Sequence, residues 1–490
     1  MKLPAQLFLA FALSLLALVG LIGWLQNVNI ITGNGLYKAI EAGPWIADFG
    51  HARLNDSNYL YFPLYGALAQ LLDLLGIMRG VAFKQFAYLN AFFASLTVAC
   101  LYAFIHRLTG SVATAILATL FHFGTGFFLL LGVISEDIMP GYFLILVSML
   151  LAGLWFDRPT YRQIAIVSTI FTFGWLVEWR LMFPTLPAFG LALLLSEGDW
   201  KARARRVAML IVSVLASATI IELCWQGHNG ALGLPDLLWT GKGVSSGWGG
   251  LSWDKAWMML SGVGNYFVIL GGFVDPLSAK RAMAPLLLSV ALQLMLFVAC
   301  AIVLWPRRDD RRLRATAIVF LGTLGAGQVM NFYAQPQDPQ MQINVMPWLT
   351  IAWALLVGAL LARRRAVWPV LAIVSLGPLV WNVGALSKWR GATLRRWPQW
   401  PHSRRTCRPI GPSTSIGASS RSRPGSSCCG ARRPTGMASR PSIALRRRRR
   451  NSSGSRSTPV RSVTPRGPPM RMRASSSTTS TLLSTSVIAW

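Results

Sequence analysis

Residues 86–105 read FAYLNAFFASLTVACLYAFI, and residues 111–133 read SVATAILATLFHFGTGFFLLLGV. Neither run contains Asp, Glu, Lys or Arg, and each has about the 20 residues that a helix needs to cross a bilayer. Between them stands Arg107-Leu108-Thr109-Gly110, a short basic turn. Two apolar runs joined by a basic turn are typical of a pair of membrane helices whose connection stays in the cytoplasm.

The same pattern continues outward through most of the chain. Of its 490 residues, 53% are hydrophobic and only 13% are charged, and the mean hydropathy is +0.47. Windows of about 20 apolar residues predict spans near 6–26, 86–105, 111–133, 139–156, 164–178, 182–196, 207–224, 283–305, 315–333, 345–361 and 367–386. The fold class is therefore predicted to be all-α, a polytopic transmembrane helix bundle of about 11 spans.

Two further apolar stretches, 59–78 and 256–273, are predicted to be interfacial helices in outer loops. If either one spanned the membrane, every later loop would change sides, and the Arg/Lys clusters would no longer share the cytoplasmic face. Gln70 and Asp73 lie on one face of the first stretch. Spanning would place Asp73 in lipid, at a cost of about 2–3 kcal/mol.

This topology predicts a multi-pass protein of the inner (plasma) membrane with a cytoplasmic N-terminus. Its domain 1–390 has a long first outer loop at about 27–85 and a large late outer loop at about 225–282. Shorter outer turns are expected at 134–138, 179–181 and 334–344. The cytoplasmic loops are short and contain no GxxxxGK[ST] or GxGxxG, so ATP-driven work by this chain alone is not expected.

Residues 391–490 form a separate tail. They contain 20 Arg but no Lys, Asp or Glu, and so supply most of the chain's net charge of +30. This Arg/Ser/Pro-rich sequence has no helical or strand period, which predicts disorder. A sequence of this composition also arises when a GC-rich coding region is read out of frame, and we expect a frameshift near Trp397–His402. The alternative is a real basic arm that binds anionic lipid or nucleic acid; with the frameshift, no nucleic-acid partner is expected.

The outer loops hold the residues that could carry chemistry. The first loop offers Asp48, His51, Arg53 and Asp56 ahead of Tyr61-Phe62-Pro63-Leu64-Tyr65. Ser135-Glu136-Asp137 precedes Pro140 at the mouth of a helix. Adjacent acids there are costly unless they are solvated, paired or bound to a cation, so they are either a site or a solvated turn.

Two later outer turns add polar groups. Glu178-Trp179-Arg180 could contact a phosphate at headgroup level, or form a local ion pair beside an anchoring Trp. Residues 333–344 read YAQPQDPQMQIN, and Asp338, Gln340 and the neighbouring amides suit a polyhydroxyl ligand or a plain polar turn. His122, within a span, is interpreted as a packing residue rather than a proton relay.

In this order the motifs resemble the GT-C membrane glycosyltransferases, in particular the bacterial protein-mannosyltransferase-like and aminoarabinose-transferase-like group. The resemblance rests on the long first outer loop, the aromatic-Pro stretch Tyr61–Tyr65, the turn Arg107–Gly110 and the acid-Pro turn Glu136–Pro140. It covers about residues 6–200 by motif and extends to about 390 by topology.

The resemblance implies an inverting enzyme that moves a sugar from a polyprenyl-phosphate donor to a hydroxyl of a lipid, glycan or protein acceptor on the periplasmic face. The family's acidic base usually follows the first helix, ahead of a Tyr, where this chain has Gly33-Asn34-Gly35-Leu36-Tyr37. Either Asp48, with His51 close by, or Asp56 has then taken over the base role, or the enzyme has lost or altered activity.

The resemblance also implies substrate contacts for the remaining polar side chains. These are His51, Arg53, Tyr61, Tyr65, Glu178, Arg180, Asp338 and Gln340. A divalent cation is left open as a cofactor, with Glu136 and Asp137 as its ligands. The alternatives are a secondary transporter, a lipid-linked polysaccharide ligase or polymerase, and a non-catalytic assembly subunit.

Overall fold

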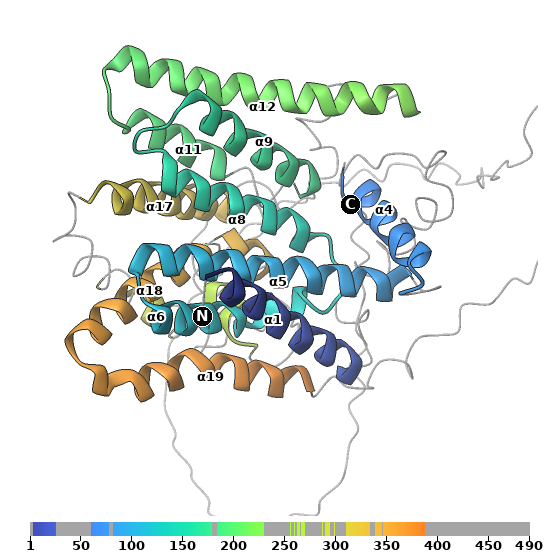
Figure 1. Cartoon of the computed structure of the whole chain (residues 1–490), viewed down its shortest axis with the longest axis vertical. Coiled ribbons are helices and arrows are strands. Elements are labelled where there is room, and N and C mark those ends of the chain that lie inside the picture. Colours follow the sequence, from blue (N-terminus) through green and yellow to red (C-terminus); the bar gives the residue numbers. More distant parts are fainter. Residues whose placement is uncertain are drawn as a thin grey trace, which may run out of the picture. The chain divides into compact units, whose positions relative to one another are not determined.

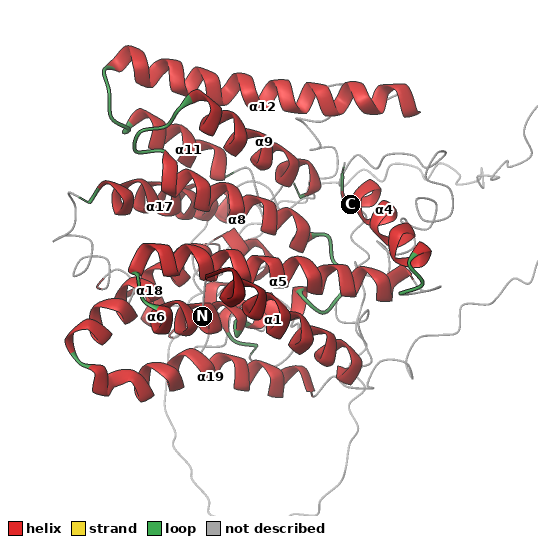
Figure 2. Ribbon diagram, in the orientation of Figure 1, coloured by secondary structure: helices red, strands yellow, loops and turns green. Residues whose placement is uncertain are grey.

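The computed structural model describes residues 3–25, 60–77, 82–178, 184–229, 310–333, 339–344 and 346–387, with isolated positions between 255 and 298. Across these residues every regular element is helical (Figures 1 and 2). The main helices are α1 (Leu3–Leu25), α4 (Tyr61–Leu74), α5 (Ala82–Thr109), α6 (Val112–Phe123), α7 (Gly126–Leu131), α8 (Ile138–Trp155), α9 (Tyr161–Val177), α11 (Thr185–Leu194), α12 (Trp200–Asn229), α17 (Arg311–Tyr333), α18 (Met346–Arg363) and α19 (Trp368–Ser387). The all-α prediction is confirmed for this part of the chain.

Seven of the described helices are long and apolar enough to cross a membrane. They are α1, α5, α8, α12, α17, α18 and α19, which fall on seven of the predicted spans. The predicted spans 164–178 and 182–196 coincide with the shorter helices α9 and α11. The total of about 11 stays a prediction. The tail 391–490 and most of the two long outer loops lie outside the described residues.

One predicted span differs from the structure. Residues 111–133 form two helices, α6 and α7, which are separated at Gly124 and Thr125. Asn382 of α19 donates from Nδ2 to the Gly124 carbonyl at 2.8 Å. The Asn382 side chain also accepts from the Ile269 N–H at 2.8 Å. A broken helix is tolerated in a bundle when a neighbour satisfies the freed backbone groups, and Asn382 does so here.

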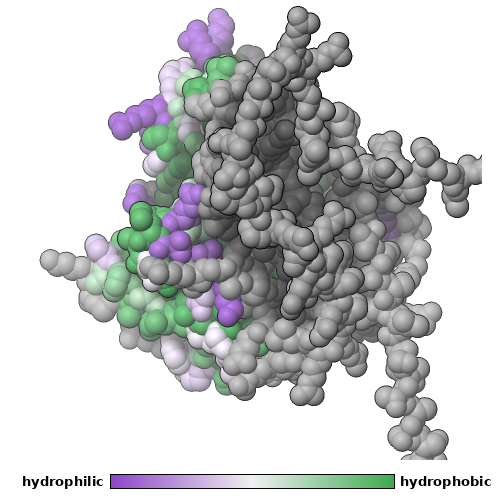
Figure 3. Space-filling view, turned by 90° about the vertical axis from the view of Figure 1, so that its right-hand side faces the viewer, coloured by the Kyte–Doolittle hydropathy of each residue, from purple (hydrophilic) through white to green (hydrophobic). Residues whose placement is uncertain are grey.

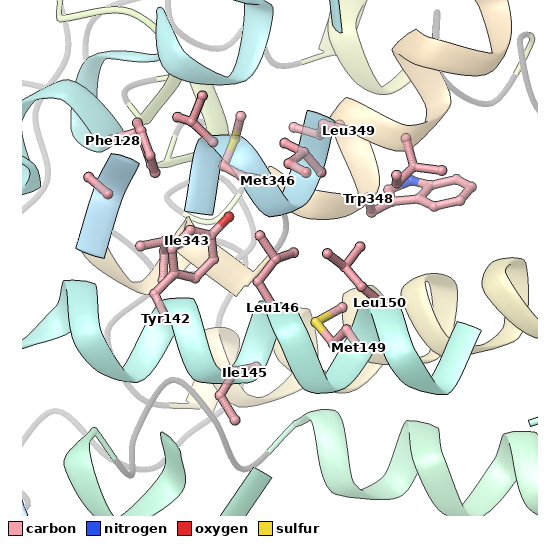
Figure 4. Close-up of a cluster of buried hydrophobic side chains, with 14 of the residues drawn as sticks. Phe128, Tyr142, Ile145, Leu146, Met149, Leu150, Ile343, Met346, Trp348 and Leu349 are labelled. Carbon is pink, nitrogen blue, oxygen red and sulfur yellow. The ribbon is translucent and has the colours of Figure 1, made fainter. Parts of the chain in front are cut away.

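Small residues bring the helices close together, as is usual in membrane bundles. A Cβ on Gly153 of α8 would lie 3.0 Å from the Thr316 hydroxyl of α17. A Cβ on Gly322 of α17 would lie 2.9 Å from Ala188 of α11. The core beside α8 includes Phe128, Tyr142, Ile343 and Met346, which come from helices far apart in the sequence (Figure 4).

The outward faces are apolar, which is the reverse of a soluble protein. Phe8 is 72% exposed, Ile373 71% and Val380 72%. Figure 3 shows such apolar surface on the described residues, interspersed with hydrophilic ones. Within the predicted span 283–305, the described positions are helical, and Leu287, Val290, Leu294 and Val298 are exposed along one helical face. The chain is a membrane protein of many helices.

Three loops that the charge pattern assigns to the cytoplasm meet at one end of the bundle. Arg158, after α8, forms an ion pair with Glu197, after α11. The Glu197 N–H donates to the Asp157 carbonyl at 3.0 Å. Arg314, at the start of α17, donates to the Leu195 carbonyl at 3.3 Å. Their shared end is what the alternating topology requires; that this end faces the cytoplasm stays a prediction.

The stretch 59–78 forms α4, which is only 14 residues long and is not among the helices that could span. Its first turns bury Tyr61, Phe62 and Tyr65 against α5, whereas Asp73 is exposed. The short length and the two-sided character agree with an interfacial helix rather than a spanning one.

Candidate functional site

The acid-bearing turn before α8 is buried. Glu136 is 1% exposed and Asp137 is 2% exposed, so the alternative of a solvated turn is wrong. Asp137 is the N-cap of α8, but its side chain makes no capping hydrogen bond. Pro140 stands at the third helical position and has no N–H to offer such a cap. The carboxylate is therefore not used to close the helix end.

Asn90 of α5 holds this turn in place. Its Nδ2 donates to the Ile134 carbonyl at 2.6 Å and to the Glu136 carbonyl at 2.7 Å. Its Oδ1 accepts from the Tyr65 hydroxyl. Asn90 is 0% exposed, so these bonds satisfy a buried amide that would otherwise be costly. Sequence reasoning missed this residue, although a lone Asn in the apolar run 86–105 was a usable signal.

Tyr61 and Tyr65 of α4 cover the turn from one side. Tyr61 donates to the Glu136 carbonyl at 3.5 Å, and both tyrosines are 0% exposed. Burial raises the pKa of both phenols well above the ordinary value of 10.0, and the Asp137 carboxylate close by raises it further. Both tyrosines therefore remain hydrogen-bond donors. In this structure they position the acid turn, and a direct contact with substrate stays a prediction.

Glu178 brings a third carboxylate to the same end of the bundle. It follows α9 and is 1% exposed. A Cβ on Gly141, one helical turn after Asp137, would lie 2.8 Å from the Glu178 Cβ. Gly141 thus lets the end of α9 approach the start of α8. The Leu60 N–H donates to the Leu176 carbonyl at 3.0 Å, which joins α4 to this end of α9.

Three carboxylates from two turns are thus held with little access to water. Burial of an ionised carboxylate destabilises the fold, by roughly several kcal/mol for each group, unless a bound proton, hydrogen-bond donors or a cation offset the cost. The N-terminus of α8 offsets part of this cost because its backbone N–H groups carry partial positive charge. Each of these carboxylates can share a proton, accept hydrogen bonds from hydroxyl groups or contribute one ligand to a cation.

The other predicted site residues are not brought into view. Asp48, His51, Arg53, Asp56, Arg180 and Asp338 lie outside the described residues, and Gln340 is described only in its backbone. No group of three or more His, Cys, Asp or Glu that could hold a metal occurs in the described ranges. A cation at Glu136 and Asp137 would need further ligands from another part of the chain or from substrate.

His122 is integrated into the packing between helices. Its Nδ1 lies 2.9 Å from the Thr350 hydroxyl of α18, and its Nε2 lies 3.3 Å from the Tyr142 hydroxyl of α8. The ring is 0% exposed. Both nitrogens have protein partners, as expected of a packing histidine rather than a proton relay.

Searches against models of known protein families and against curated proteins find no match. The class of the protein therefore rests on the fold alone: it is a helical membrane protein with at least seven helices capable of spanning. Its candidate site is the buried acid turn Glu136–Asp137, with Glu178 buried against Gly141 in the first turns of α8.

Proposed function

We propose that this chain is a membrane glycosyltransferase of GT-C type with about 11 spans. It would move a sugar from a polyprenyl-phosphate donor to a hydroxyl of a lipid, glycan or protein acceptor on the periplasmic face of a bacterial inner membrane. The main support is the burial of Glu136, Asp137 and Glu178 together, at 1%, 2% and 1% exposure, beneath the aromatic start of α4. The resemblance implies an acid-Pro outer turn that follows an aromatic-Pro stretch along the chain, and both motifs occur here in that order.

The reaction needs a base, a place for the acceptor and a means to offset the leaving charge. The acceptor oxygen attacks the anomeric carbon, its proton passes to a carboxylate, and the bond to the phosphate oxygen breaks with its electron pair going to the phosphate. Asp48 or Asp56 of the first outer loop would take the proton. Arg53, Arg180 or a divalent cation at Glu136 and Asp137 would offset the charge on the departing polyprenyl phosphate.

The experiment is sugar transfer by the full chain in liposomes, with a labelled polyprenyl-phosphate sugar as donor. Asp48→Asn and Asp56→Asn are compared, and the one that removes the base should lower the rate by about 10²- to 10⁴-fold. Asp137→Asn and Glu178→Gln should each lower it at least about tenfold, because each removes a buried charge from the site.

The matched control is Glu197→Gln. Glu197 is also an acid in a short turn between two helices, but it forms an ion pair with Arg158 at the opposite end of the bundle. Its loss should leave the transfer rate unchanged. Full activity in all four site variants would reject the proposal, and solute transport in the absence of any lipid-linked donor would favour the transporter alternative.

A further inference from the structure

A second polar cluster lies where α17 meets the 3-10 helix η3 (Pro339–Asn344). It consists of four amide side chains, which we call the amide cluster: Gln328 and Asn331 of α17, and Gln342 and Asn344 of η3. Gln328 Nε2 donates to Gln342 Oε1 at 3.0 Å, which joins the two elements. Asn331 follows Gln328 by three residues and so lies on the same face of α17.

Asn331, Gln342 and Asn344 are buried and Gln328 is half-buried, and three of the four amides, Gln328, Gln342 and Asn344, are incompletely bonded. Gln342 is 0% exposed and Asn344 is 6% exposed. Neither the Oδ1 nor the Nδ2 of Asn344 finds a hydrogen-bond partner within the described part of the chain, and Gln342 Nε2 and Gln328 Oε1 find none there either. Buried amides are normally satisfied, so this cluster has donors and acceptors to offer to something else.

The backbone is shaped to keep Asn344 there. A Cβ on Gly327 would lie 2.7 Å from Asn344 Nδ2 and 3.1 Å from its Oδ1. The absence of a side chain at Gly327 is therefore what lets the amide lie against α17. By contrast, a Cβ on Gly325 of the same helix would meet nothing within 4 Å.

Ile343, which lies between Gln342 and Asn344 in the chain, belongs to the same hydrophobic core as Tyr142 of α8 (Figure 4). The residue before Tyr142, Gly141, lies against Glu178.

The chemistry of the cluster selects its ligand. Uncharged amides supply both donors and acceptors, which match the hydroxyl groups of a sugar. A phosphate would call for Arg or Lys, and a cation would leave the Nδ2 and Nε2 donors unsatisfied. We propose that Gln328, Asn331, Gln342 and Asn344 form a subsite for the hydroxyl-rich ring of a glycosyl group. This proposal rests on the proposed function and names the part of the substrate that these residues recognise.

The test is equilibrium binding by the full chain in nanodiscs. The probes are polyprenyl phosphate carrying one sugar, bare polyprenyl phosphate and a free oligosaccharide. The wild-type chain should bind the sugar-bearing lipid more tightly than the bare lipid. Asn344→Leu should weaken binding of the sugar-bearing lipid by about tenfold, and so remove the preference, while leaving affinity for the bare lipid unchanged.

Two further variants guard against misfolding. Gly327→Ala moves the Asn344 amide without deleting it and should weaken the same preference, whereas Gly325→Ala should not. The Asn344 amide has no hydrogen-bond partner among the described residues, so its replacement leaves no other described group unbonded. Asn344→Leu should therefore leave the melting temperature equal or higher. A merely structural amide would lower it.

The outcomes separate this inference from the proposed function. A preference that survives in Asn344→Leu, or a wild-type chain that binds both lipids equally, overturns the sugar subsite but not the transferase. Binding of neither lipid overturns both. Competition by the free oligosaccharide against the sugar-bearing lipid in wild type but not in Asn344→Leu supports the subsite, because the two sugars then compete for the same residues.

Discussion

At the scale of single residues, the site depends on polar side chains that hold backbone rather than on the acids alone. Asn90 bonds two carbonyls of the acid turn, and Tyr65 bonds Asn90. Both contacts join groups from different helices. The acids Glu136, Asp137 and Glu178 were found from the sequence as charges at helix mouths. Asn90 was not, because only packing shows which of the polar residues in an apolar run meets a loop.

The raised pKa values of Tyr61 and Tyr65 predict an alkaline limit to stability. A folded-state pKa above the unfolded value of about 10 means that the folded chain holds the proton more tightly. The resulting stability is complete below about pH 10 and is lost as pH rises toward the folded pKa. Melting temperature measured from neutral to alkaline pH should therefore fall above about pH 10, and the fall should be shallower in Tyr61→Phe and Tyr65→Phe.

The control is Tyr161→Phe, because Tyr161 is 51% exposed. It should reproduce the wild-type alkaline slope. If Tyr65→Phe shows the same slope as wild type, the burial of its phenol is not what limits stability at high pH.

At the scale of helices, close approach at glycine sets the geometry of the site. Gly141 allows Glu178, at the end of α9, to approach the first turns of α8, and Gly327 allows Asn344 of η3 to lie against α17. The sequence showed these glycines but not their partners. The break between α6 and α7 also depends on a neighbouring helix, because Asn382 of α19 donates a hydrogen bond to the Gly124 carbonyl at the break.

Gly141→Ala should separate the start of α8 from the end of α9. The added Cβ would meet the Glu178 Cβ at 2.8 Å, and overpacking of this kind costs about 1–3 kcal/mol. Thermal unfolding should show the loss, and sugar transfer should fall with it. Gly190→Ala in α11 is the matched control, since nothing lies within 4 Å of its Cβ and Ala favours a helix by up to about 1 kcal/mol. Equal melting temperatures for the two variants would contradict the close approach.

At the scale of the whole molecule, the two ends of the bundle differ in chemistry. One end gathers Arg158, Glu197 and Arg314. The other gathers Glu136, Asp137 and Glu178 under α4. This division is the reason for placing the reaction outside the cytoplasm, because short basic loops stay in and acidic turns are free to go out.

Reporter fusions test that placement. Fusion of alkaline phosphatase after Asp137 should give an active, exported enzyme, and fusion after Asp199 should not. A fluorescent protein that folds only in the cytoplasm should give the opposite pattern. An inactive phosphatase after Asp137 would place the carboxylates in the cytoplasm and remove the basis for a polyprenyl-phosphate donor on the outer side.

The sequence by itself determined the class, because a bilayer imposes a length and an apolar composition on each span that can be read residue by residue. It also determined that α4 is too polar at Asp73 to be a span, and which turns carry the acids. Only the tertiary structure decided that Asn90 and the tyrosines of α4 hold the acid turn, and that Glu178 joins it across Gly141. It also decided that Gln328 of α17 bonds Gln342 of η3. These are contacts between segments far apart in the chain, and apolar periodicity does not specify which helix face meets which neighbour.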